Sequence, residues 1–215
     1  MHAGDGTLYR TSRTSLVWEL RGALEEYAYY ENHVKPLIET LFHETFRPKY
    51  RSGGKNGCYG IQTCSKSLIA FLCKSGFRPG SKTHTLTVPE IIWKSTRNIQ
   101  RAFLRGVFDT DGCIRFDKNH TRRHYYPKIE VCSASKDFRD GLSQLLHRLG
   151  FRHHIWTSHG KYVAYTLCIA GIASAHTWFR TIGTNNPKHI KKFKRLPLAA
   201  VDIATVTQPG TVRDC

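Results

Sequence analysis

The sequence predicts an α+β protein built from two similar units, because helical and strand-like patterns alternate twice along its 215 residues. Three pairs of landmark residues recur at separations of 106, 104 and 107 residues: Asp5 and Asp111, Ile38 and Leu142, Gly76 and Gly183. Such a repeat indicates one structural unit used twice. Each unit is expected to run helix, hairpin, helix, hairpin, helix, with antiparallel sheets. The expected units are 1–100, which includes a linker from Phe77 to Gln100, and 101–215, which includes a basic tail.

In the first unit, two strand patterns alternate with two helical patterns. Val, Trp, Tyr, Ile and Thr, which favour strands, concentrate in Ser15–Leu20 and Cys58–Thr63. Apolar residues recur at helical spacing in His33–Phe42. A second helix is expected from about Lys66 to Ser75, where Gly76 follows as a stop signal.

The second unit repeats this order with clearer signals. Helices are expected at Phe138–Leu149 and at about Ile172–Ile182, the latter stopped by Gly183. Strand patterns lie between them, at Tyr126–Cys132 and Lys161–Cys168.

The most informative segment opens this second unit, at Phe103–Gly112. It is an apolar, helix-compatible run with a small residue, Gly106, that ends in Asp109, Asp111 and a terminating glycine; the strand-like 113–116 follows. Carboxylates in the last turn of a helix repel each other and the negative end of its dipole. A hard divalent cation such as Mg²⁺ is the expected compensation.

Composition points to a basic, folded protein that meets a polyanion. There are 33 Lys and Arg against 16 Asp and Glu, a net charge of +17, spread along the chain. The seven cysteines make no paired CxxC, which argues against a disulfide framework or a zinc ribbon. No signal peptide or long apolar span is found. We therefore expect a soluble, intracellular protein with no membrane partner, whose compartment the sequence leaves open.

Leu104–Gly112 resembles the LAGLIDADG signature of homing endonucleases, and Ala3–Leu8 echoes its last residues and the strand that follows. Thr87–Ile91 and Asn186–Lys192 resemble other stretches of that family. The resemblance implies a monomer whose two motif helices pack side by side beneath a saddle of two sheets. It also implies that Asp5 and Asp111 are catalytic and bind a divalent metal, Mg²⁺ or Mn²⁺, whereas Asp109 is not the principal ligand.

The partner that the resemblance implies is double-stranded DNA with a long recognition site. Hairpin cations are the expected contacts, because a two-stranded ribbon fits the major groove. The candidates are Arg10, Arg13, Lys49, Arg51, Lys55, Gln62, Arg115, Lys118, Arg122, Arg123, Lys128 and Lys161, of which Gln62, Arg115 and Lys128 are expected to read bases. The family often has a basic residue near the metals; Lys136 is the first choice for this catalytic role, and Lys161 the second.

The first motif departs from the pattern, because only four residues precede Asp5. Without the missing helix, Gly106 and Val107 would lose their packing partner, and a chain extended at its N-terminus should be more stable or more active. The expected function is an intron-encoded, site-specific DNA endonuclease. The alternatives are an RNA maturase that acts on intron RNA, a DNA-binding regulator that has lost cleavage, and a basic ribonucleoprotein subunit.

Overall fold

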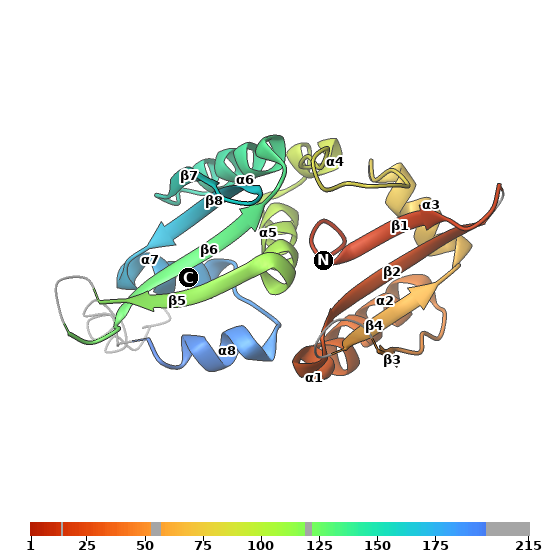
Figure 1. Cartoon of the computed structure of the whole chain (residues 1–215), viewed down its shortest axis with the longest axis horizontal. Coiled ribbons are helices and arrows are strands. Elements are labelled where there is room, and N and C mark those ends of the chain that lie inside the picture. The colour runs from red at the N-terminus through yellow and green to blue at the C-terminus, as the bar shows by residue number, and fades with distance from the viewer. Residues whose placement is uncertain (14, 53–56, 119–121, 197–215) are drawn as a thin grey trace, which may run out of the picture.

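The computed structural model describes residues 1–13, 15–52, 57–118 and 122–196, and it consists of two four-stranded antiparallel sheets. The sheets lie side by side, each with helices packed on one face (Figure 1). The predicted α+β class with two antiparallel sheets is therefore confirmed. The first sheet has the order β1-β2-β4-β3 and the second the order β5-β6-β8-β7.

The first sheet and its helices use residues up to Lys74. Its strands are β1 (Gly6–Arg10), β2 (Leu16–Ala23), β3 (Lys49–Arg51) and β4 (Cys58–Thr63). Between β2 and β3 the chain forms one nearly continuous helical segment of four labelled parts: η1 (Leu24–Glu26), α1 (Tyr27–Tyr29), the π-helical η2 (Tyr30–Val34) and α2 (Lys35–Phe42). Helix α3 (Lys66–Lys74) begins at Ser65, whose hydroxyl accepts from the Leu68 N–H, and Gly76 follows with φ +96°.

The second sheet follows a short linking helix, α4 (Glu90–Trp93). Helix α5 (Arg97–Asp111) leads into the strands β5 (Gly112–Asp117), β6 (Tyr126–Ser133), β7 (His154–His159) and β8 (Val163–Ala170), with α6 (Lys136–Arg148), α7 (Ile172–Thr181) and α8 (Pro187–Phe193). Helix α6 shows why these boundaries form. The Ser135 hydroxyl caps its start, and His147 and Arg148 complement its negative end.

The two sheets share one register, which gives the repeat a structural meaning. In the first sheet Gly6 pairs with Leu20, and Leu20 pairs with Ile61. In the second sheet the equivalent pairs join Gly112 to Val131 and Val131 to Leu167. A residue at a given distance from Gly6 in β1 therefore has its counterpart at the same distance from Gly112 in β5.

Each sheet buries one face against its own helices. In the first core, Leu20 and Ile61 pack with Leu68 and Leu72 of α3. The second core is larger, and its buried side chains include Leu104, Val107, Phe108, Ile114, Ile129, Phe138, Leu142, Leu145, Ile169 and Trp178. Helix α5 belongs to this second core, and its small and acidic residues face the other half of the molecule.

The start of the chain is a turn, residues 1–5, that packs against α5 (Figure 1). A Cβ on Gly106 would lie 2.7 Å from the Met1 nitrogen, and Val107 is only 1% exposed. The expectation that these two residues lack a packing partner is therefore wrong, since the turn covers the C-terminal half of α5. Next to this turn an apolar cavity of about 440 Å³ remains open, lined by residues that include Leu41, Phe71, Ile99 and Phe103.

Candidate active site and nucleic-acid interface

Asp5 and Asp111 come together where the N-terminal turn meets the end of α5. Gly4 makes this approach possible, because a Cβ there would lie 2.0 Å from Thr110 Oγ1 and 3.0 Å from Asp111 Cγ. Burial, together with the negative charges of Asp111 and Glu26, raises the pKa of Asp5 to about 6. Desolvation by the surrounding protein also raises the pKa of Asp111, although its side chain reaches solvent. The pair is thus an unneutralised concentration of negative charge.

Two lysines from distant segments oppose this negative charge. The positive charges of Lys82, in the linker, and Lys188, in α8, each lower the pKa of both carboxyls. Lys82 Nζ donates to the carbonyl oxygens of His2 (2.8 Å), Ala3 (2.7 Å) and Gly4. It therefore holds the N-terminal turn in place as well as acting on the acids. Desolvation lowers the pKa of Lys82, and the charges of Asp111 and Asp5 raise it.

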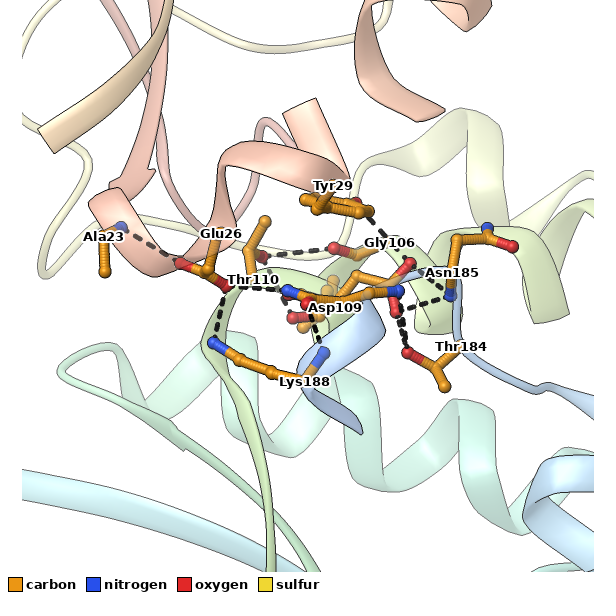
Figure 2. Close-up of polar contacts among 11 residues, drawn as sticks. Ala23, Glu26, Tyr29, Gly106, Asp109, Thr110, Thr184, Asn185 and Lys188 are labelled. Atoms are coloured by element: carbon orange, nitrogen blue, oxygen red, sulfur yellow. Dashed lines mark hydrogen bonds and ion pairs between the residues drawn. The ribbon is translucent and has the colours of Figure 1, made fainter. Parts of the chain in front are cut away.

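Asp109 has a different environment, although it lies in the same helix end. It is 1% exposed and accepts hydrogen bonds from the Thr184 hydroxyl, from the Asn185 N–H at 3.1 Å and from the Tyr29 hydroxyl at 3.5 Å (Figure 2). Desolvation raises the pKa of Asp109, and the Thr184 and Asn185 donors lower it only in part. Because these donors occupy its carboxylate oxygens, the expectation that a cation compensates both acids of α5 does not hold for Asp109, and Asp111 is the acid of α5 left for a ligand.

A buried polar network ties the two halves together beside the acid pair. Asn186 is fully buried, and its Nδ2 donates to Glu26 Oε1 at 2.7 Å and to the Asp109 carbonyl at 2.8 Å. Glu26 also accepts from the Ala23 N–H and forms an ion pair with Lys188 at 2.7 Å (Figure 2). The first half thus supplies the acid that holds Lys188, whereas the second half supplies Lys188 itself.

The donor set fits a divalent ion that is shared with a substrate. Among the described residues, no group of three or more His, Cys, Asp or Glu side chains is placed to hold a metal ion. Asp5 and Asp111 would therefore be the carboxylate ligands, and phosphate oxygens and water would complete the coordination. A pocket of about 200 Å³, lined by residues that include Lys82, Asp111 and Cys132, lies next to Asp111.

The predicted base readers Gln62, Arg115 and Lys128 lie on the sheet faces turned away from the helices. Each of them neighbours a core residue along its strand, and successive strand residues point to opposite faces. Lys49 and Arg51 lie in β3, at the edge of the first sheet.

The other predicted DNA contacts surround these faces. Arg10 ends β1, and its guanidinium bonds the Arg13 carbonyl in the adjoining turn. The connection between β5 and β6 carries Lys118, Arg122 and Arg123, and Lys161 lies between β7 and β8 with its Nζ 5.5 Å from the Tyr162 ring centroid. Lys55 lies outside the described residues.

Lys136 does not join the acid pair. It begins α6, with 62% of its side chain exposed, and forms an ion pair with Asp140 at 2.7 Å. The lysines whose charges act on both Asp5 and Asp111 are Lys82 and Lys188. Sequence reasoning missed Lys82 because nothing marks it in the linker. For Lys188 the sequence does carry a local signal. Asn186 and Pro187 are typical of a helix start, and this places Lys188 in the first turn of α8.

Comparison with known proteins agrees with this architecture. Residues 98–183 match the family described as LAGLIDADG-like domain. Variants of the homing endonuclease I-DmoI have a similar structure, with a TM-score of 0.60 and 20% identity over 85% of this chain and 90% of theirs. The meganuclease I-SmaMI, solved on uncleaveable DNA, gives a TM-score of 0.55 at 10% identity over 90% of this chain and 85% of its own.

Curated relatives match over short segments. The chain is 35% identical to the probable translation initiation factor IF-2 of Methanocaldococcus jannaschii over 75 residues, 35% of this chain and 6% of that protein. It is 30% identical to the replication factor C small subunit of the same organism over 136 residues, 61% of this chain and 7% of that protein. The chain thus spans less than a tenth of the length of either relative. None of the helices in the described parts of the chain is long and apolar enough to cross a membrane.

Proposed function

We propose that this chain, whose residues 98–183 match the LAGLIDADG-like domain and whose fold is similar to that of I-DmoI, is a site-specific DNA endonuclease that uses divalent metal held by Asp5 and Asp111. The observation that carries the proposal is the convergence of these two acids, one from each half, at a point flanked by Lys82 and Lys188. I-DmoI has been solved with DNA and Mn and with DNA and Ca. Mg²⁺ or Mn²⁺ is the cofactor we infer for this chain.

The acids and lysines would divide the work of phosphodiester hydrolysis. Bound metal would supply charge neutralisation at the transition state and an activated water. Asp5 and Asp111 would hold the metal, with one acid serving each strand of the duplex. Glu26 fixes Lys188 beside the pair, where its ammonium would stabilise the developing negative charge. Lys82 already donates to three carbonyl groups. We therefore assign it the role of fixing the N-terminal turn and supplying positive charge near the acids, and not that of transferring a proton.

Duplex DNA is the proposed partner, with the strand faces against its major groove and the loop cations on phosphates. A single chain with two equivalent halves can address both strands, so we infer that it acts as a monomer. The curated relatives carry matching segments in proteins as different as an initiation factor and a replication factor subunit. That distribution supports a transferable unit, and hence a role in the homing of a mobile element such as an intron.

The test is cleavage of a plasmid library of diverse target sites with Mg²⁺ or EDTA, by the wild type, Asp5→Asn and Asp111→Asn. We expect Mg²⁺-dependent linearisation at a preferred site. Either substitution should lower its rate by at least about 10²–10³-fold, the scale for losing a group that stabilises transition-state charge. Asp137→Asn, in the first turn of α6, is the control and should cleave normally. Tight, salt-sensitive binding without cutting would instead favour a maturase or a DNA-binding regulator.

A further inference from the structure

Glu19 and Glu130 occupy the same place in the two sheets, where a carboxylate is unexpected. Glu19 precedes Leu20 in β2, and Glu130 precedes the equivalent Val131 in β6. Both glutamates therefore point away from the cores, onto the faces that carry the predicted DNA contacts. A negative charge there weakens the attraction of a basic surface for a polyanion. Its presence in both halves calls for a role other than affinity.

In the second sheet, Glu130 holds an arginine. Its Oε2 accepts from Arg115 Nε at 2.8 Å, and Arg115 Nη1 donates to Asp117 at 2.6 Å. The guanidinium is thus fixed between carboxylates of two strands, while 45% of the Arg115 side chain stays exposed. Lys128 also pairs with Asp117, at 2.6 Å, so the array spans both strands.

Glu130 is itself firmly placed. The residue is 8% exposed, and its Oε1 is buried without a hydrogen-bond partner among the described residues. Its carboxylate lies close to two thiols. Desolvation and, after it, the charge of Glu130 raise the pKa of Cys113 and raise that of Cys168 to about 12. Thiols are weak donors, so the only strong bond of this carboxylate that the described residues supply is the one to Arg115.

In the first sheet, Glu19 contacts Arg21 and forms an ion pair with Arg51 at 3.5 Å, and it also orients a glutamine through a tyrosine. Tyr9 lies three residues after Gly6, the place that Arg115 occupies after Gly112, and its hydroxyl donates to Glu19 at 3.1 Å. Gln62 Nε2 in turn donates to the Tyr9 oxygen at 2.9 Å. This relay fixes which way the exposed Gln62 amide faces, leaving its oxygen and a second N–H for a ligand.

We propose that Glu19 and Glu130 are positioning residues that set the base preference of the two halves. Glu130 presents Arg115 to guanine, and Glu19, through Tyr9, presents Gln62 to adenine. Arg matches the O6 and N7 acceptors of guanine, and Gln matches the N6 donor and N7 acceptor of adenine. This inference rests on the proposed function, because it takes duplex DNA as the ligand. It explains why acidic residues lie on a basic face: they lower the affinity for DNA in general and raise the preference for one base over another.

The test is selection of bound duplexes from a randomised pool in Ca²⁺, followed by binding titrations on the preferred site and on single-base variants. Glu130→Gln keeps the shape and should lower the preference for guanine at one base pair by roughly tenfold. Glu19→Gln should do the same for adenine at a different base pair. Both should bind random DNA more tightly. Glu90→Gln in α4 removes an equally negative but exposed side chain outside the sheets, and should leave both preferences unchanged.

A second measurement separates positioning from a general effect on folding. In an Arg115→Ala background, Glu130→Gln should cause no further loss of guanine preference, because its partner is already gone. Preferences that persist in both Glu variants of a selective wild-type protein would overturn the inference while leaving the proposed function intact. A wild-type protein that binds DNA without any base preference and does not cut it would overturn both.

Discussion

At the scale of single residues, two acids that lie two positions apart in α5 have different surroundings. Asp109 accepts hydrogen bonds from Tyr29, Thr184 and Asn185 and has a structural role. Asp111 lies close enough to Asp5 for its charge to raise the pKa of that carboxyl. Residue type is the same in both cases, so the difference lies in what the fold places opposite each side chain: mainly the loop before α8 for Asp109, and the N-terminal turn for Asp111. The charge at Asp111 and Asp5 is thereby left for a ligand, at a cost in stability.

That cost is measurable. The pKa of Asp5 is about 6 in the fold and lies near 3.8 in the unfolded chain, so the folded state binds more protons between these values. Stability without metal should therefore fall as the pH rises from about 4 to 6. We expect Asp5→Asn to reduce this fall, to which the raised pKa values of Asp109 and Asp111 also contribute, and to raise the melting temperature above pH 6, by about 2–4 °C for each kcal/mol gained. Thermal melts in EDTA across pH 4–8 check it.

Added Mg²⁺ provides the internal control. The wild type should then gain stability because metal binds the folded state, whereas Asp5→Asn should gain less. An Asp5→Asn protein that melts below the wild type at pH 7 in EDTA would show that Asp5 stabilises the fold through contacts other than metal.

At the scale of elements, the connection into α8 links the halves. Asn186 caps α8 by accepting from the Lys188 N–H, and it also bridges Glu26 and the Asp109 carbonyl. One buried side chain therefore caps a helix near Lys188 and joins η1 of the first half to α5 of the second. Edge strands show the opposite case. β3 and β7 are polar and mostly exposed, so little in their sequence marked them as strands.

We predict that Asn186→Ala lowers both stability and cleavage. Loss of the cap costs about 0.5–2 kcal/mol, and the hydrogen bonds lost by buried Glu26 and the Asp109 carbonyl add about 1–3 kcal/mol. Freed from this bridge, Glu26 and Lys188 should hold the site less well, so the cleavage rate should fall even at temperatures where the variant is folded. Urea unfolding and cleavage kinetics measure the two effects.

Asn185→Ala is a matched control one residue away. Its contact with Asp109 comes from the backbone N–H, which the substitution keeps. Equal losses in the two variants would argue that the loop tolerates no change, and that the Asn186 side chain has no special part in it.

At the scale of the whole molecule, the two halves are equivalent in their sheets but not in their first helices. The second half opens with α5, whereas the turn at residues 1–5 stands in the equivalent place of the first half. The apolar cavity beside this turn exposes large side chains, with Leu41 at 60% and Phe71 at 54% exposure. A helix placed there would bury apolar area at about 25 cal/mol per Å².

We therefore expect that ten added residues identical to Arg97–Gly106, joined directly before Met1, raise the melting temperature and the cleavage rate. They would rebuild the segment that precedes the acid in α5, with Phe103 and Leu104 of the copy entering the cavity. The control is the same extension with those two apolar positions changed to Gln. Identical melting and cleavage of the extended and unextended chains would contradict the prediction.

Local patterns in the sequence were enough for the repeat and most element boundaries. Segment 58–63 was expected as a strand and is β4, and the glycines expected to stop two helices, Gly76 and Gly183, both have positive φ. Gly112 ends α5 for another reason. Its φ is −82°, and a Cβ there would lie 2.1 Å from the Phe108 ring. Periodicity and backbone chemistry are local properties, which one chain reveals without its fold.

The sequence by itself determined the α+β class, the twofold repeat, the basic surface and the two acids that end its motifs. Only the tertiary structure decided which acid is neutralised by hydrogen bonds, which lysines act on the other, and which carboxylates hold the cations of the sheet faces. The physical reason is that pKa shifts and buried hydrogen bonds depend on groups brought close from distant segments. Lys82 in the linker and Lys188 in α8 reach one site from segments about a hundred residues apart, and no spacing in the sequence encodes that meeting.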